Sequence, residues 1–593
     1  MPRLAIVQFR PGKGELAENL GRIGSLLGSL AERKQPPDLL LFPEAALTGY
    51  LLEGGVRDLA LPAGDLMDRL QAMHRAAKAP PVDVALGFYE KHRGTLYNSV
   101  LYGALGGPDA GLIHVHRKLF LPTYGVFDEE RFVEPGLVLR AFDTRFGRLG
   151  MLICEDAWHA LTPTILALQG AQLVLIPSAS PARGTQPLEE TVSRPANVSR
   201  WERIARYVAE EHGVWVAVSQ LVGFEGGKGF AGGSVVASPR GDVVARGPLW
   251  QEAEIETLVD FEEVGRARAD LPLLADLQTK LPHLLRSLEL GASGGARDTV
   301  RGARDEATRT ADRAPASPVS QPDPMQFDAP LVERWLVEFL REEVTRRRSF
   351  ENVVVGLSGG VDSALVAHLA AKAFGPEHVY GFALPYRTSS PQSLAHARLV
   401  AERLGIHFRV VDISAAVDGY LQAAEPEADP SRAGNVMARE RMIVLFDQSA
   451  KLKALPLGTG NKTERLLGYF TWHADDSPPI NPIGDLFKSQ VWQLARHMRV
   501  PAEIVDKPAT ADLVKGQTDE GDLGIAYPRA DLILYWLLRG FRSEEIQRHG
   551  FTADEVRLVE RRLESTHWKR RMPTVAMLSP TAIGEYYLRP VDY

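Results

Sequence analysis

The chain has 593 residues, more than the roughly 250–300 that one hydrophobic core usually serves, so two large domains are expected. Apolar residues make up 45% of the sequence and charged residues 24%, which is ordinary for a soluble globular protein. The formal net charge of -7 argues against general binding to nucleic acid or anionic membranes, but it is compatible with a local basic pocket for a small phosphate-rich ligand.

Cys154 is the single cysteine of the sequence, so no disulfide can form within the chain and a cytoplasmic location is expected. The first residues, MPRLAIVQFRPGKGEL, lack the long apolar core of a signal peptide. No stretch of about 18 uninterrupted apolar residues predicts a transmembrane helix.

The first part of the chain alternates short apolar runs with amphipathic segments of helical length. Buried strands are expected at Leu4–Phe9, Leu39–Phe42, Val84–Tyr89, Leu149–Ile153, Leu173–Ile176 and Val214–Gln220. Helices are expected at Asn19–Lys34 and Ser199–His212, and hairpin strands at Asn98–Tyr102 and Gly233–Ala237. This alternation predicts an α/β domain in which helices cover a sheet.

The composition changes between Gly291 and Pro324, where Gly, Ala, Ser, Pro and charged residues replace large apolar ones. Such a segment cannot bury enough surface to offset its ordering entropy. We therefore expect one domain at 1–265, a largely flexible linker at 266–325 and a second domain at 326–593.

The last part begins with an amphipathic segment that predicts a helix. This helix is expected at Pro330–Arg348. It is followed by a strand at Asn352–Leu357, a helix from Ser363, a strand at Val379–Leu384, a helix at Ser393–Leu404 and a strand at Phe408–Asp412. The alternation of strands and helices predicts a doubly wound parallel sheet.

Between the strand Asn352–Leu357 and the following helix lies the segment Ser-Gly-Gly-Val-Asp-Ser, residues 358–363. Its glycines allow backbone N–H groups to approach a phosphate, and the N-terminus of the helix adds a favourable dipole. Ser358 and Ser363 can donate to phosphate oxygens, whereas Asp362 implies an intervening Mg²⁺ ion. The segment lacks the lysine of a Walker A loop; the simpler alternative is a tight turn with a capping serine.

This loop resembles the SGGxDS loop of the ATP pyrophosphatases, and four later segments resemble those of the NAD synthetase family within that group. They are N-V-M-A-R-E-R-M at 435–442, G-T-G-N-K-T-E at 458–464, N-P-I-G-D-L-F-K at 481–488 and K-P-A-T-A-D-L at 507–513, followed by H-W-K-R at 567–570. The resemblance covers about residues 330–575. It implies a Rossmann-like fold of the adenine nucleotide α-hydrolase type and ATP-dependent amidation of nicotinic acid adenine dinucleotide through an adenylated intermediate.

The resemblance also implies roles for residues at matching positions. ATP is expected to contact Ser358, Gly359, Gly360, Asp362, Ser363, Arg441, Thr459, Lys488 and Thr510. Asp362 and Glu464 are expected to bind Mg²⁺, and Asn435, Asp475 and Lys569 to contact the deamido dinucleotide. The sequence departs from the family at Pro479, which stands where a second aspartate is usual; Asp476 is one substitute, and a different loop is the other.

Around Cys154 the sequence is G-M-L-I-C-E-D-A-W, and alone such a cysteine is more often a buried hydrophobe than a nucleophile. Glu44, in L-L-F-P-E-A-A-L-T-G-Y, and Lys118, in H-R-K-L-F-L-P-T-Y-G, precede it. Together the three segments resemble the nitrilase (carbon–nitrogen hydrolase) superfamily over about residues 3–260, which implies an α-β-β-α sandwich.

In that chemistry a cysteine thiolate attacks an amide, a glutamate moves the protons, and a lysine stabilises the oxyanion. The resemblance assigns these roles to Cys154, Glu44 and Lys118, with Glu129 supporting the lysine and Glu130 as the rival. Glutamine is expected to contact Tyr124, Glu155, Ser178 and Ser180.

We therefore expect an enzyme that makes NAD⁺ with ammonia from glutamine, passed along a sheltered path, and that forms a homo-oligomer. Three alternatives stay open: another ammonia-using pyrophosphatase, a synthetase that uses free ammonia beside an inactive amidase, and a non-catalytic dinucleotide-binding module.

Overall fold

The computed structural model describes residues 1–123, 127–186, 193–293, 323–510 and 518–571. The chain divides into two compact units. Among the described residues, the first comprises those of Met1–Gly184 and Arg194–Gln321, and the second those of Thr185–Ser193 and Pro322–Glu585. Within the described ranges, none of the helices is both long and apolar enough to cross a membrane.

The first unit contains two six-stranded sheets. One sheet has the order β14 (Ala253–Leu258), β1 (Arg3–Gln8), β2 (Leu39–Leu41), β3 (Val82–His92), β4 (Thr95–Leu105), β5 (Gly111–Arg117). The other has the order β13 (Val243–Arg246), β12 (Val235–Ala237), β9 (Trp215–Gln220), β8 (Leu173–Ser178), β7 (Gly147–Met151), β6 (Phe142–Thr144). A separate hairpin joins β10 (Val222–Glu225) to β11 (Lys228–Ala231).

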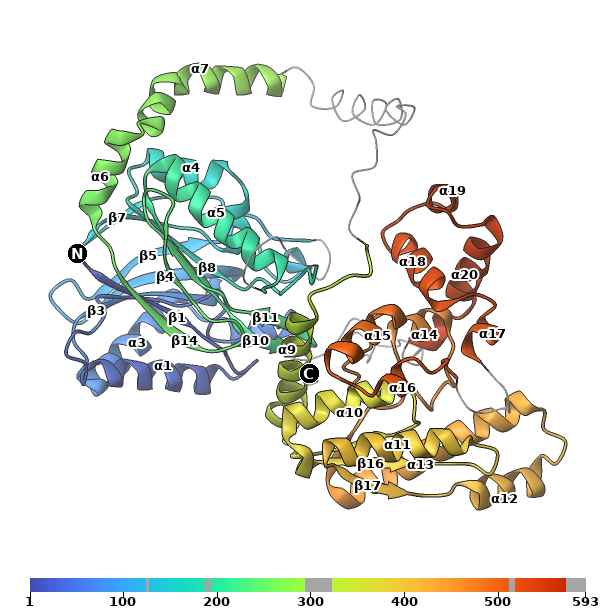
Figure 1. Ribbon diagram of the computed structural model, residues 1–593. Helices are drawn as coiled ribbons and strands as arrows, with labels where there is room; N and C mark the ends of the chain where they lie inside the picture. Colours follow the sequence, from blue (N-terminus) through green and yellow to red (C-terminus); the bar gives the residue numbers. More distant parts are fainter. Residues whose placement is uncertain (124–126, 187–192, 294–322, 511–517, 572–593) are drawn as a thin grey trace. The chain divides into compact units, whose positions relative to one another are not determined.

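Helices cover the outer face of each sheet, and the inner faces pack together (Figure 1). Helices α1 (Leu16–Leu30) and α3 (Ala63–Ala77) pack on the first sheet, and α4 (Leu161–Leu168) and α5 (Ala196–His212) on the second. The apolar residues between the sheets include Ile6, Leu41, Met151 and Leu175. This is the α-β-β-α sandwich that the sequence predicts. Successive strand side chains point alternately toward the other sheet and toward the covering helices, so both faces of each sheet are buried.

Helices also occupy part of the region predicted as a largely flexible linker. These are α6 (Phe261–Asp270) and α7 (Leu273–Ser293). Leu274 and Leu277 of α7 pack into the apolar cluster under α4 and α5, so the start of this helix gains buried contacts. The rest of the predicted linker, residues 294–322, lies outside the described residues.

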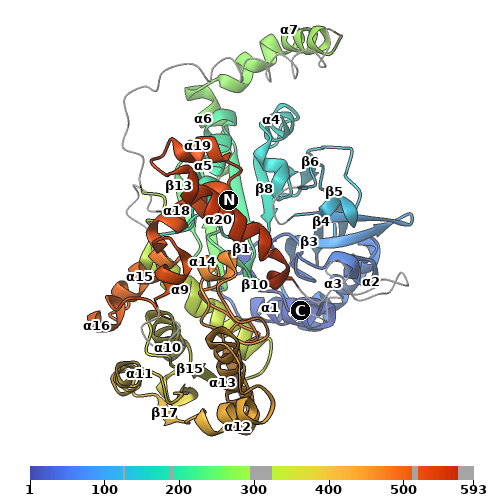
Figure 2. The same cartoon turned by 90° about the vertical axis from the view of Figure 1, so that its right-hand side faces the viewer.

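The second unit is built on a four-stranded parallel sheet. Its order is β17 (His407–Val410), β16 (Val379–Ala383), β15 (Asn352–Gly356), β18 (Ala454–Leu457). Helices α9 (Ala329–Leu340), α10 (Val361–Phe374), α11 (Pro391–Leu404) and α15 (Lys488–His497) pack on one face, and α12 (Ser414–Ala424) and α13 (Pro430–Leu452) on the other (Figure 2). This confirms the predicted doubly wound sheet.

A separate helical cluster completes the second unit. Its elements are α14 (Lys462–Leu467), α17 (Asp519–Leu523), α18 (Tyr527–Leu537), α19 (Ser543–Gln547) and α20 (Ala553–Ser565). The strand order reverses between β15 and β18, and ligands of such sheets bind in the crevice at this switch point.

Candidate active sites

Glu44 and Lys118 lie in the turns that follow β2 and β5 of the first unit. Both side chains are fully buried. The Glu44 turn packs against Gly87 of β3, where a Cβ atom would lie only 2.3 Å from the carbonyl oxygen of Pro43. The backbone N–H of Lys118 donates to the carbonyl oxygen of Asn98 at 2.9 Å. Strands β3 and β4, which carry Gly87 and Asn98, lie between β2 and β5, so one sheet brings the two residues together from distant positions in the sequence.

The ammonium group of Lys118 donates to two carboxylates. Its Nζ atom lies 2.7 Å from Oε1 of Glu44 and 2.7 Å from Oε1 of Glu129. Glu129 is 8% exposed and also accepts from the Tyr50 hydroxyl, whereas Glu130 is exposed. Contact with the lysine therefore favours Glu129 over Glu130 as the supporting carboxylate.

Two further donors hold the Glu44 carboxylate in place. Asn98 Nδ2 donates to Oε1 at 2.8 Å, and the Ala179 N–H donates to Oε2 at 2.7 Å. Neither Asn98 nor Tyr50 is predicted to be a functional residue from the sequence. Asn98 is a polar residue in a mostly apolar strand, and this was the signal that could have revealed it.

Cys154 begins a 3₁₀ turn, η3 (Cys154–Trp158), a short distance after β7. Its φ of 43° is unusual for a residue with a side chain and marks a sharp turn at the position of the predicted nucleophile. The Ser178 hydroxyl, at the end of β8, donates to Sγ at 3.3 Å. Ser178 and Ala179 therefore contact the thiol and the Glu44 carboxylate from consecutive positions of one strand end.

Electrostatic interactions link the buried groups of Glu44, Lys118 and Glu129 to the Cys154 thiol. Burial, and then the negative charge of Glu44, raise the pKa of the Cys154 thiol well above its usual value. Burial alone would lower the pKa of Lys118, but the carboxylates of Glu129 and Glu44 outweigh it and raise that pKa. Burial raises the pKa of Glu129 to about 7 despite the nearby lysine. The cluster therefore has a thiol that needs a base, beside a permanently charged cation.

Only some of the residues predicted to bind glutamine lie next to Cys154. Ser178 contacts the thiol, as described above, and Glu155 follows Cys154 directly within η3. Ser180 Oγ instead accepts from Asn197 Nδ2 at 3.1 Å, a contact that fixes the loop. Tyr124 lies outside the described residues.

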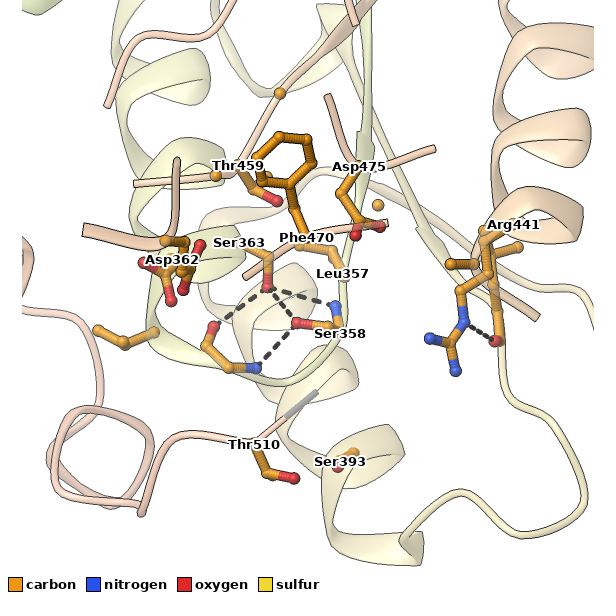
Figure 3. A pocket seen from close by; sticks show the side chains of 18 of the residues that line it. Leu357, Ser358, Asp362, Ser363, Ser393, Arg441, Thr459, Phe470, Asp475 and Thr510 are labelled. Atoms are coloured by element: carbon orange, nitrogen blue, oxygen red, sulfur yellow. Dashed lines mark hydrogen bonds between the residues drawn. The ribbon is translucent and has the colours of Figure 1, made fainter. Parts of the chain in front are cut away.

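In the second unit, the loop 358–360 connects β15 to α10 at the switch point of the sheet. Ser363 Oγ accepts from the Ser358 N–H at 3.2 Å and donates to the Gly360 carbonyl oxygen at 3.1 Å (Figure 3). Gly359 has a φ of 76°, and a Cβ atom there would lie 2.1 Å from the carbonyl oxygen of Ser393. Only glycine fits this position.

Beside this loop, the Lys488 ammonium group lies between two carboxylates. Its Nζ atom is 2.5 Å from Oδ2 of Asp362 and 3.5 Å from Oε1 of Glu464. Asn461 caps α14 and donates from Nδ2 to Oδ1 of Asp362 at 3.0 Å. Burial raises the pKa of Glu464 to about 8; Lys488 opposes this shift, and the charges of Asp362 and Asp519 add to it.

These groups line a cavity of about 280 Å³ that Figure 3 shows from close by. The predicted residues that line it are Ser358, Gly360, Asp362, Ser363, Arg441, Thr459, Glu464, Asp475, Lys488 and Thr510. Apolar side chains form another part of its wall, namely Phe382, Leu384, Met442 and Leu445. The cavity thus joins an apolar wall to a polar loop and a charged cluster, and this combination fits a nucleotide.

Three predicted residues do not line the cavity: Gly359, Asn435 and Lys569. Asn435 accepts from the Thr471 hydroxyl at 3.0 Å. Lys569 donates to the carbonyl oxygens of Gly468 and Phe470 at 2.9 and 3.0 Å. Asn435 and Lys569 therefore hold the segment 468–471, and Phe470 of that segment faces the cavity.

Pro479, the departure noted in the sequence, is exposed and does not line the cavity. Asp475 and Asp476 do line it. The Asp476 carboxylate accepts from the Ala474 N–H at 3.2 Å, so it belongs to the same turn as Asp475. A carboxylate is therefore present at this wall although the usual position of the second aspartate is a proline.

The two sites define the class of protein: a nitrilase-type hydrolase unit joined to a nucleotide-binding unit of the ATP pyrophosphatase type. Comparisons agree, since the carbon-nitrogen hydrolase family matches residues 3–269 and the NAD synthase family matches residues 332–573. An NH(3)-dependent NAD(+) synthetase of Trichlorobacter lovleyi is 47% identical over 270 residues, which are 45% of this chain and 98% of the relative. One from Fusobacterium nucleatum is 46% identical over 248 residues, 42% of this chain and 95% of the relative.

The chain therefore belongs to the NAD synthase family and carries an N-terminal carbon-nitrogen hydrolase domain. Solved structures with the same fold extend over both units. The glutamine-dependent NAD+ synthetase of Acinetobacter baumannii, solved with adenosine diphosphate, covers 97% of this chain and 95% of its own, with a TM-score of 0.66 and 23% identity. That of Cytophaga hutchinsonii covers 96% and 93%, with a TM-score of 0.67 and 16% identity.

Proposed function

We propose that this enzyme hydrolyses glutamine in its first unit and uses the ammonia in its second unit to convert nicotinic acid adenine dinucleotide to NAD⁺ at the expense of ATP. The observation that carries the proposal is the buried cluster of Glu44, Lys118 and Glu129 beside the Cys154 turn, in one chain with a nucleotide cavity. An NAD synthase that used only free ammonia would have no need of that cluster.

In the first unit, Glu44 takes the proton of the Cys154 thiol as the sulfur attacks the carboxamide carbon of glutamine. Lys118 stabilises the negative charge that develops on the carboxamide oxygen. Glu44 then returns its proton to the leaving nitrogen, so that ammonia departs and a glutamyl thioester stays on the sulfur. Glu44 next removes a proton from water, which attacks the thioester; the C–S bond breaks, glutamate is released, and Glu44 returns the proton to the Cys154 sulfur.

In the second unit, an oxygen of the nicotinate carboxylate attacks the α-phosphorus of ATP and pyrophosphate leaves. Ammonia then attacks the mixed anhydride, and AMP leaves as the amide forms. The hydroxyls of Ser358 and Ser363 and the N-terminus of α10 are the donors that the loop offers to phosphate oxygens. Lys488 and Arg441 add positive charge at the cavity wall.

Mg²⁺ fits the carboxylates of Asp362 and Glu464, since this ion is usually held by one or two carboxylates together with substrate phosphates. The position of both carboxylates on the cavity wall, beside the loop that offers donors to phosphate oxygens, supports the assignment. Within the described ranges, no group of three or more metal-binding side chains is present, so phosphate oxygens would complete the coordination. When bound, the ion would neutralise charge on the phosphates of ATP.

Further parts of the proposal rest on general features of the chain. The single cysteine suits the reducing cytoplasm, and the net charge of -7 suits a protein that binds small molecules and not nucleic acid. The likeness to the NAD synthetase family implies a homo-oligomer, which light scattering of the purified chain would test.

The decisive experiment traces the amide nitrogen of glutamine into the product. The chain is given ATP, nicotinic acid adenine dinucleotide and glutamine labelled with ¹⁵N in its amide, and NAD⁺ is analysed by mass. We expect the label in the nicotinamide group. Cys154→Ala should abolish synthesis with glutamine and preserve synthesis with ammonium, whereas Asp362→Ala should abolish both. Unlabelled product, or loss of the ammonium reaction in the cysteine variant, would contradict the proposal.

A further inference from the structure

Asp156 lies two residues after Cys154, and its fully buried carboxylate accepts four hydrogen bonds. Oδ1 accepts from the backbone N–H groups of Leu119 at 2.9 Å and Phe120 at 3.0 Å. Oδ2 accepts from the backbone N–H of Ile153 at 3.0 Å and lies 2.9 Å from Nε2 of His116. A buried carboxylate is expensive to desolvate unless every lone pair finds a donor, and here the donors are supplied.

The four donors come from the two segments that hold the reacting groups. Leu119 and Phe120 directly follow Lys118, and His116 precedes it by two residues at the end of β5. Ile153 directly precedes Cys154. One carboxylate therefore fixes the backbone after the lysine, the His116 side chain before it, and the backbone next to the nucleophile.

Local capping explains one of these contacts and no more. Asp156 is the third residue of the η3 turn, and a carboxylate there commonly accepts from the N–H before the turn, as it does from Ile153. The contacts to Leu119, Phe120 and His116 span 36 to 40 residues of sequence and contribute nothing to a cap. His116 is 2% exposed, and its ring nitrogen donates if the carboxylate is ionised.

We propose that Asp156, with His116, is a positioning residue that holds the Lys118 ammonium group in register with the Cys154 thiol. The inference rests on the proposed glutaminase function. A lysine that stabilises an oxyanion must lie at a fixed distance from the attacking sulfur, because misplacement by about 1 Å can cost about 100-fold in rate. Asp156 contacts both segments directly.

Asp156→Asn in the full chain tests the proposal. The amide keeps an oxygen for Leu119 and Phe120 but turns an NH₂ group toward the Ile153 N–H and His116, so the contact between the two segments is weakened on one side. We expect kcat for glutamine hydrolysis, per thiol titrated by alkylation, to fall about 10–100-fold with little change in KM. Ammonium-supported synthesis should equal that of the unmodified protein.

A readout of geometry separates positioning from simple loss of folded protein. Lys118 lowers the pKa of the Cys154 thiol against the effects of burial and Glu44, so a displaced lysine should move the pH profile of iodoacetamide alkylation to higher pH. His116→Gln keeps a donor for Asp156 and should stay close to the unmodified protein, whereas His116→Leu should resemble Asp156→Asn. Asp109→Asn, the same change at an exposed site, is the matched control.

Three results would overturn the inference. They are an unchanged kcat per titrated thiol in Asp156→Asn, an unchanged alkylation profile, and equal behaviour of the two His116 variants. If Asp156→Asn does not fold, the two His116 variants still decide. If the unsubstituted chain releases no ammonia from glutamine, the proposed function and this inference are both overturned. If that chain is active and the Asp156→Asn variant is equally active, only the inference is overturned.

Discussion

Replacing Lys118 by methionine should separate the two reactions and destabilise one unit selectively. Methionine matches the length and apolar stem of lysine but has no charge. The side chain of Lys118 is 0% exposed, and those of its partners Glu44 and Glu129 are 0% and 9% exposed. Solvent therefore screens these contacts little, and the small values typical of surface ion pairs do not apply.

The structure sets the size of both effects. Removing one partner of a buried ion pair costs about 3–5 kcal/mol, because the remaining charge is left uncompensated. Here two carboxylates lose a donor at 2.7 Å, although Glu129, whose pKa burial raises to about 7, can relieve part of the cost by taking up a proton. Loss of an oxyanion donor lowers kcat about 10²–10³-fold, or about 2.7–4 kcal/mol.

Calorimetry and two activity assays measure these effects in one preparation. The transition of the first unit should shift to lower temperature while that of the second unit stays in place. Glutamine-supported synthesis should fall about 10²–10³-fold, and ammonium-supported synthesis should be unchanged. Lys280→Met, the same change on the exposed face of α7, is the control. A variant that keeps more than about a tenth of its glutamine-dependent kcat would refute the oxyanion role of Lys118.

Three further predictions concern protonation, helix anchoring and the metal. Burial raises the pKa of Glu129 to about 7, and the ionised form is the one that supports Lys118. The rate of glutamine hydrolysis should therefore rise with pH through about 7. In a pH–rate profile, the Glu129→Gln variant should lack this rise. The buried Asp531 carboxylate accepts from the Thr463 hydroxyl and the Ser489 N–H, and these two residues directly neighbour Glu464 and Lys488. Asp531→Asn should therefore reduce ammonium-supported synthesis and preserve glutamine hydrolysis. An effect on hydrolysis would contradict this. Removing Mg²⁺ with a chelator should stop synthesis from either nitrogen source, and continued release of pyrophosphate would count against the metal assignment.

The strands, and the proximity of residues within one short segment, can be predicted from the sequence because both follow from local patterns. Apolar runs such as Leu173–Ile176 and Asn352–Leu357 correspond to β8 and β15. Ser358 and Ser363 lie in the loop 358–360 and the first turn of α10, so their proximity follows from the chain itself. In such cases the spacing along the sequence already contains the geometry.

Contacts between distant segments are not visible in this way. Glu129 and Glu130 are adjacent in a charged run, and the burial of one and the exposure of the other depend on how the turn packs over Lys118. Asn98 and Tyr50 reach the amidase cluster from another strand and another loop. The same holds for α7, whose first turns are helical because α4 and α5 supply an apolar surface.

The two sites use one arrangement, a buried lysine held between carboxylates, under different charge balance. At the amidase site, Glu129 has a pKa near neutrality, so proton uptake can balance the charges of Lys118 and Glu44 without any added cation. At the nucleotide cavity, Lys488 faces Asp362, Glu464 and Asp519, and Asp362, Glu464 and Lys488 all line the open space where phosphates would enter.

Bringing a polyphosphate against these carboxylates would add negative charge to a site that already raises the pKa of Glu464 to about 8. A proton on Glu464 would remove one charge, whereas a divalent cation offsets two and also bridges carboxylate to phosphate. The charge balance therefore favours binding of ATP together with a divalent cation, as proposed above, whereas at the first site proton uptake by Glu129 can balance the charge.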